Sequence, residues 1–424
     1  MGPLPKPQTL GLSPSFGYGD RIGLATPGHL GAHLQSATEQ AALGVSVIEP
    51  IFAQQSIREM QRTHRTAFDV MKSGAKALKH EKFEGAWGGD ADHLKTNADV
   101  DVTVRAGFTF FTIDPSDHVD VEADDYDTAT LDAKFDEIKN RVDWVDEYLG
   151  KTITIEEGEP IVFDQVAVRR AAVKYGSAIR HSLSLAAYIK ATAHRAGQAH
   201  EIEISVDETP QPTTPGEHYI IADQLVRAGV KLVSLAPRFE GDFEKGIDFK
   251  GDVASFERSL TLHAAIARQV GPYKLSLHSG SDKLSIYTAF ARITRGLFHV
   301  KTAGTSYLEA LRAVSRHDMN LFRHVVDYSR KHFERDRATY HISATLADSP
   351  PEKEVSDDRE LVRFYLDEDN GRQILHVTFG TVLIDSLFQP ALLGVLKHHP
   401  DTYREILTFH FGKHLRALGA GMQA

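Results

Sequence analysis

Residues 274–305 read KLSLHSGSDKLSIYTAFARITRGLFHVKTAGT and contain the pattern that decides the fold. Two short apolar runs, 274–277 and 298–301, flank an amphipathic stretch whose apolar residues have helical spacing. Polar and small residues follow each run at once, beginning with His278 after the first. Strand, helix and strand in this order are typical of a parallel sheet covered by helices. This stretch therefore predicts an α/β fold.

The same alternation extends over the rest of the chain. Six further runs are predicted as strands, at 22–26, 45–48, 85–87, 108–113, 202–206 and 231–235. Helical periodicity is clearest at 66–82, 163–195, 256–269 and 305–316. In the last of these, Ser306 and Glu309 match a capping box. Eight strands in 424 residues predict a single (β/α)₈ domain of the TIM-barrel type spanning residues 1–424.

Two acidic segments interrupt this pattern, near residues 117–158 and 347–369. They are predicted to be solvated loop insertions, and either of them is a candidate lid. Two more strand-like pieces, 340–344 and 374–379, follow the eighth predicted strand. These pieces leave the strand count open.

The composition excludes several classes of function. The formal charge is −10 without a basic tract, which argues against nucleic-acid binding. There is no cysteine, so any metal must be bound by His, Asp or Glu. The chain has no signal-peptide pattern and no apolar run of membrane-spanning length, so we expect a cytoplasmic protein without a membrane partner. A homo-oligomer is left open.

Histidines near the ends of the predicted strands are candidate metal ligands, since the carboxyl ends of barrel strands form the active site. His93 and His278 stand out because they lie within runs of Gly, Asp, Ser and Lys. His29, His341 and His376 are weaker candidates, because a lone histidine after a strand is more often structural. A catalytic metal site with three protein ligands would draw on this set.

Acidic and basic side chains occur at the same strand ends. Asp92, Asp207 and Glu208 suit proton transfer or support of a metal ligand, although helix capping explains any one of them equally well. The basic candidates would suit a substrate that carries a carboxylate or phosphate, and they are Lys174, Arg238, Lys245, Lys283 and Lys301. A dinucleotide loop is not indicated, because the glycines near residue 17 have the wrong spacing.

Long strings of the sequence resemble those of the tagaturonate epimerase family. They include SFGYGDRIGLATPGH at 15–29, GDADHLKT at 89–96, LVSLAPRFEGDFEKGIDF at 232–249, GPYKLSLHSGSDK at 271–283 and HVKTAGTSYLEALR at 299–312. The resemblance covers roughly residues 15–380. It implies a metal-dependent epimerase on a TIM-barrel scaffold that inverts carbon 4 of D-tagaturonate, a sugar acid, to give D-fructuronate.

The implied reaction constrains the chemistry. Carbon 4 is adjacent neither to the ketone carbon nor to the carboxylate, so its deprotonation would leave an unstabilised carbanion. Transient oxidation would need a nicotinamide cofactor, and the dinucleotide fingerprint is missing. Retro-aldol cleavage between carbons 3 and 4, rotation of the aldehyde and re-addition need a base and a Lewis acid.

With this resemblance, the strand-end residues receive roles as hypotheses. His93 and His278 bind a divalent metal, with His341 as a less certain third ligand. Asp92 and Glu208 exchange the protons. The side chains that hold the substrate are Arg238, Lys245, Lys283 and Lys301.

Three alternatives remain at this point. A related metal-dependent aldolase or ketose isomerase would use the same chemistry on another sugar. A sugar-acid sensor would bind ligand without turnover. Lys301 could also form a Schiff base with substrate, because strand-end lysines suit that role.

Overall fold

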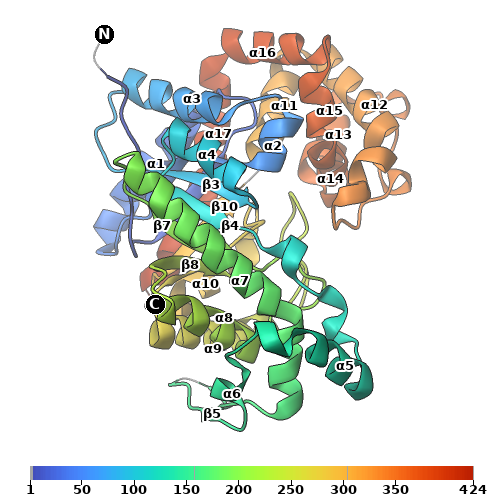
Figure 1. The fold of residues 1–424 in the computed structure, drawn as a ribbon. Helices are drawn as coiled ribbons and strands as arrows, with labels where there is room; N and C mark the ends of the chain where they lie inside the picture. The colour runs from blue at the N-terminus through green and yellow to red at the C-terminus, as the bar shows by residue number, and fades with distance from the viewer. Residues whose placement is uncertain (1–2, 157, 303, 424) are drawn as a thin grey trace.

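A closed barrel of eight parallel strands forms the centre of the computed structural model, which describes residues 3–156, 158–302 and 304–423 (Figure 1). Each strand pairs with the one before it in the chain, and the last pairs with the first. The barrel strands are β1 Ser15–Gly19, β2 Glu49–Ser56, β3 Gly88–Leu94, β4 Phe110–Ile113, β7 Glu201–Ser205, β8 Leu232–Ala236, β9 Lys274–Leu277 and β10 Phe298–Thr302. The predicted (β/α)₈ architecture is confirmed.

Helices connect the strands and cover the outside of the barrel. The connecting helices are α1 Thr26–Leu43, α2 Ile57–Arg62, α3 Ala67–His80, α4 Asn97–Ala106, α7 Gln165–Arg195, α8 Pro215–Arg227, α9 Val253–Val270, α10 Leu284–Ile293 and α11 Thr305–His317. The four helices that periodicity predicts correspond to α3, α7, α9 and α11, with boundaries that differ by a few residues. Their amphipathic faces pack on the strands, as the periodicity requires.

The chain continues beyond α11 into a C-terminal group of helices. This group contains α12 Met319–Asp336, α13 Asp358–Val362, α14 Asp369–Val377, α15 Phe379–Ile384, α16 Phe388–His398 and α17 Pro400–Gln423. The last helix, α17, returns to pack against both α1 and α10. It therefore lies on the outside of the barrel between α1 and α10.

The predictions for the first three strands are wrong in position. Residues 22–25 form a bend that leads into α1 at Thr26 instead of a strand, because the Asp20 carboxylate accepts hydrogen bonds from the backbone N–H groups of Ile22, Gly23 and Ala25. The runs 45–48 and 85–87 end directly before β2 and β3. The true strands carry Gly, Pro, Gln, Asp and His inside the barrel, so the search for apolar runs selected their apolar neighbours.

Other expectations also need correction. The segment 117–158 is partly helical, with α5 Thr128–Ile138 and α6 Val145–Tyr148, and it leads into a small antiparallel pair, β5 Thr152–Ile153 and β6 Ile161–Val162. Figure 1 shows these elements gathered near one end of α7, apart from the C-terminal helices. The segment 347–369 contains α13 and short helical turns.

Neither of the extra strand-like pieces forms a strand. Residues 340–344 have no regular structure, and most of 374–379 belongs to α14 and α15, where its apolar side chains are buried among helices. A short apolar run fits a buried helix as well as a strand. Among the described residues, no helix is long and apolar enough to cross a membrane.

Candidate active site

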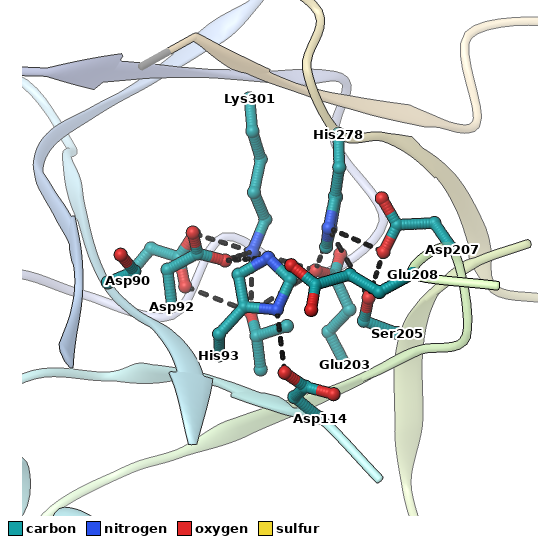
Figure 2. A network of polar contacts seen from close by, with 12 residues as sticks. Asp90, Asp92, His93, Asp114, Glu203, Ser205, Asp207, Glu208, His278 and Lys301 are labelled. Carbon is teal, nitrogen blue, oxygen red and sulfur yellow. Dashed lines mark hydrogen bonds and ion pairs between the residues drawn. The ribbon is translucent and has the colours of Figure 1, made fainter. Parts of the chain in front are cut away.

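Ionisable side chains from five strands or their following loops meet at the carboxyl end of the barrel (Figure 2). They come from β3, β4, β7, β9 and β10 and are Asp90, Asp92, His93, Asp114, Glu203, Asp207, Glu208, His278 and Lys301. Most are buried, and Glu208 reaches the solvent. Parallel strands bring these residues together because their carboxyl ends open on the same rim.

Lys301 lies at the centre of this group. Its Nζ atom is 2.8 Å from Asp90 Oδ2, 2.7 Å from Asp92 Oδ1 and 2.8 Å from Glu203 Oε1. Burial alone would lower the pKa of Lys301, but the three carboxylates raise it well above its ordinary value. The side chain therefore stays an ammonium ion, which disfavours the free amine that a Schiff base requires.

The two predicted histidine ligands, His93 and His278, face each other with ring centroids 5.3 Å apart. His93 Nδ1 lies 3.2 Å from Asp114 Oδ2, and His93 Nε2 lies 3.8 Å from Asp92 Oδ1. Burial opposes protonation of His93, yet Asp92 and its other carboxylate neighbours raise the pKa to about 10. A positive charge is thus favoured where these acids converge.

His278 has two carboxylate neighbours of its own. Its Nε2 atom is 2.8 Å from Glu203 Oε1, and its Nδ1 atom is 3.4 Å from Asp207 Oδ1. Burial lowers the pKa of His278, but Asp207 and Glu203 outweigh burial and Lys301, and the pKa rises to about 9. Neither Glu203 nor Asp207 was assigned a firm role from the sequence. Glu203 alternates with isoleucines along β7, a spacing that points it into the barrel.

The donor set fits a divalent cation. Asp92, His93 and His278 each offer a ligand atom within 4.8 Å of the others, and His93 shares a second such group with Asp114 and Glu208. Glu203 Oε2 is fully buried and has no hydrogen-bond partner among the described residues. Imidazoles combined with carboxylates are common ligands of divalent transition metals. A cation would also compensate the excess of buried carboxylates.

Backbone strain accompanies the two histidines. His93 has a φ of 52° within β3, where the register with β4 shifts between Ala91 and Leu94. Ser279, directly after His278, has a φ of 51°. Residues other than glycine rarely adopt this left-handed conformation, and such strain occurs preferentially at functional sites. Nothing in the strand pattern signals it.

Three of the predicted site residues are not brought into this group. His341 is 77% exposed and pairs with Asp242 at 3.4 Å, in a loop without a second histidine. Arg238 donates to the backbone carbonyls of Phe239 and Gly241. Lys283 is buried and donates to the backbone carbonyls of Glu244, Ile247 and Ser281. The sequence predicts that Arg238 and Lys283 bind substrate, but in the structure both side chains bind backbone carbonyls of loops.

Lys245 and Glu208 do face the site. Both line a cavity of about 420 Å³ that also contains Asp92 and His93. Lys245 donates to Ser279 Oγ at 2.5 Å, and both oxygens of Glu208 lie 3.3 Å from Arg58. The cavity lining also includes Arg21 and Tyr340, which the sequence patterns did not single out.

Comparisons with known proteins identify the family of the chain. The model of the tagaturonate epimerase family matches residues 3–418. A tagaturonate/fructuronate epimerase from Thermotoga maritima is 43% identical over 415 residues, covering 97% of this chain and 82% of that protein.

Solved structures give the same result. A glycerol complex of a fructuronate-tagaturonate epimerase from Cohnella laeviribosi superposes with a TM-score of 0.90. It is 39% identical, and the match covers 98% of this chain and 83% of that chain. The native crystal structure of the same enzyme gives the same values. The chain therefore belongs to the tagaturonate epimerase family and is an epimerase, an enzyme of the isomerase class.

Proposed function

We propose that this enzyme interconverts D-tagaturonate and D-fructuronate by inverting carbon 4, with a divalent metal held at the barrel mouth. The observation that supports the proposal most directly is the pair of facing histidines, His93 and His278, which carboxylates surround. His93 also lines a cavity whose walls include the cationic side chains of Arg21 and Lys245. The relatives described above are named for the same two sugar acids.

We assign Asp92, His93 and His278 as the residues that would hold the metal, with Glu203 beside them. Asp92 was predicted from the sequence to carry protons. Burial would raise its pKa, but His93 and Lys301 lower the pKa well below its ordinary value. Such a carboxylate stays ionised and suits a metal better than a proton. A divalent cation bound here supplies a Lewis acid that polarises a carbonyl oxygen.

Glu208 is the proposed proton carrier. It lies on the cavity lining, and its partner Arg58 is partly exposed, so the carboxylate can reach substrate. It takes the proton of the carbon-4 hydroxyl while the bond between carbons 3 and 4 breaks. The bonding electrons pass into the fragment that contains the ketone, and carbon 4 becomes an aldehyde. After the aldehyde turns over, carbon 3 adds to its other face and Glu208 returns the proton.

Removal of the metal should abolish the reaction. D-Tagaturonate incubated with the purified protein should give D-fructuronate, and activity should fall to background after chelation and return with a divalent metal. Metal content measured by mass spectrometry and circular dichroism of the stripped protein serve as controls. Full activity without bound metal would contradict the metal assignment. Inactivity with every metal would contradict the function, and accumulation of three-carbon products would indicate an aldolase.

The proposed bond cleavage also predicts the fate of the hydrogen on carbon 4. Cleavage between carbons 3 and 4 leaves this hydrogen on the aldehyde, so D-fructuronate formed in D₂O should contain no deuterium at carbon 4. The ¹H NMR spectrum of the product measures this directly. Deuterium at that carbon would show that inversion proceeds by deprotonation and would exclude the retro-aldol route.

A further inference from the structure

The N-terminus of α11, which follows the site strand β10, has no side-chain cap. The predicted capping box is wrong, since α11 starts at Thr305 with Gly304 as its N-cap, and the Ser306 hydroxyl donates to the carbonyl of Gly19. The Thr305 hydroxyl is buried and has no hydrogen-bond partner among the described residues. Free N–H groups at a helix start attract anions, and barrel enzymes often bind them after the last strands.

Arg21 supplies an unused donor at the same place. Its Nε and Nη2 atoms contact Glu59 Oε1 at 2.7 and 2.6 Å, and its guanidinium stacks on Phe379 at 3.5 Å. The Nη1 atom is buried without a hydrogen-bond partner in the described parts of the chain. A Cβ atom placed on Gly304 would lie 2.6 Å from this Nη1 atom. The unpaired end of the guanidinium therefore lies against the start of α11.

His376, from α14, also lies against Gly304. Its imidazole is fully buried, and neither ring nitrogen has a partner among the described residues. Burial, followed by the charges of Arg21 and Lys245, holds the pKa of His376 well below its ordinary value, so the ring is neutral. Its Cε1 atom also lies against Gly304, whose φ of 90° suits glycine.

Lys245 lies in the same cavity as Arg21 and two residues of the candidate active site. Both Lys245 and Arg21 line the cavity that contains Asp92 and His93. The Lys245 ammonium donates a hydrogen bond to the hydroxyl of Ser279, next to His278, whereas Glu59 pairs with Arg21. The cavity lining thus combines acids and bases near His93, where Arg58 contacts Glu208 and Lys95 contacts Asp114, and a further cation, Arg21, lies against Gly304 at the start of α11. A molecule with a carboxylate at one end and a ketone at the other matches this charge distribution.

We propose that Arg21, Lys245 and the N-terminus of α11 bind the carboxylate of the sugar acid, with His376 as a positioning residue behind them. The inference rests on the proposed function and adds the orientation of the substrate to it. The carboxylate belongs to the aldehyde fragment, which must turn before carbon 3 adds again. Holding carbon 6 lets carbon 4 rotate while the fragment stays in the site.

Equilibrium binding tests this assignment without requiring turnover. Dissociation constants of D-fructuronate and the neutral ketose D-fructose are measured by calorimetry on the metal-loaded protein. Lys245→Met should weaken D-fructuronate binding by about 10- to 100-fold, as expected for loss of a charged hydrogen bond. D-Fructose binding should change less than about twofold, because this sugar has no carboxylate with which the Lys245 ammonium could pair.

Matched variants make the result specific. Lys250→Met removes the same charge from the same loop, where Lys250 is 41% exposed and bonds to Ser343, and it should leave both affinities unchanged. Arg21→Lys, which retains the charge but loses the guanidinium geometry, should weaken D-fructuronate selectively. Thermal unfolding confirms that each variant folds. Unchanged D-fructuronate affinity in both Lys245→Met and Arg21→Lys, or equal losses for both sugars, would overturn the inference.

The two proposals can fail separately. Epimerisation of D-tagaturonate with normal D-fructuronate affinity in both variants would leave the proposed function intact and refute the carboxylate site. The opposite result would be a protein that lacks epimerase activity but binds the carboxylate selectively, with Lys245→Met abolishing this binding. It would support the carboxylate site and refute the proposed reaction.

Discussion

Replacing His278 by alanine should remove the bound divalent metal and lower kcat/KM by at least about 10³-fold, because a Lewis acid supplies several kcal/mol of transition-state stabilisation. His278 is one of two imidazoles in the group of ligand atoms, and it is buried against Glu203 and Asp207. Its loss would leave a carboxylate-rich site with a single histidine. Metal content and steady-state kinetics measure the two effects.

His341→Ala is the matched control, because the sequence assigned both histidines to the metal. His341 is 77% exposed, and its ring pairs with Asp242 at 3.4 Å, away from the other histidines of the site. We expect His341→Ala to retain metal and to keep kcat/KM within about twofold, as for a surface substitution. Loss of metal in both variants would favour the sequence-based assignment, whereas retention of metal in His278→Ala would contradict both assignments.

The later strands could be located from the sequence because no ionisable site residue interrupts their apolar runs. β9 is predicted without error, and β10 to within one residue, since Leu275, Leu277, Phe298 and Val300 form the expected apolar runs. In these strands the functional residue stands at the end of the run. The search for residues that follow an apolar run therefore found His278 and Lys301.

The first three strands were misplaced because glycines and polar residues interrupt their apolar pattern, and in β3 these polar residues belong to the candidate site. β3 carries Asp90 and Asp92 within the strand, where a simple apolar pattern predicts a loop. His93 was still found, because its glycine- and aspartate-rich neighbourhood is unusual for a structural histidine. The predicted position of β3 was thus wrong, whereas His93 lies among the ionisable side chains at the barrel mouth, and its role as a metal ligand stays a prediction.

The remaining site residues depend on contacts between distant segments. Lys301 was expected to hold substrate, and only the folded barrel shows that Asp90, Asp92 and Glu203 surround it. The failure of His341 has the same origin, because a histidine after a strand-like run resembles a ligand until its exposure is known. Periodicity reports which side chains are buried, and it does not report which buried charges share a partner.

Replacing Glu208 by glutamine should lower kcat by about 10²- to 10⁴-fold, the usual contribution of a positioned acid–base group. Metal content should stay at the wild-type level, since Asp92, His93 and His278 remain. The fold should also persist, because Glu208 and its partner Arg58 are 36% and 46% exposed, and exposed ion pairs contribute little stability. The variant therefore separates proton transfer from metal binding, which His278→Ala cannot do.

The matched control is Glu240→Gln, an exposed carboxylate in the loop between β8 and α9 that lies outside the lining of the cavity. It loses the same charge and should keep kcat unchanged. Single-turnover kinetics with metal-loaded enzyme would show whether Glu208→Gln slows the chemical step itself. A kcat near that of the wild type would remove Glu208 from the mechanism and return the proton to Asp92. In that case the low pKa of Asp92 would have to rise when substrate displaces its contact with Lys301, because an ionised carboxylate that stays paired with an ammonium ion is a weak base.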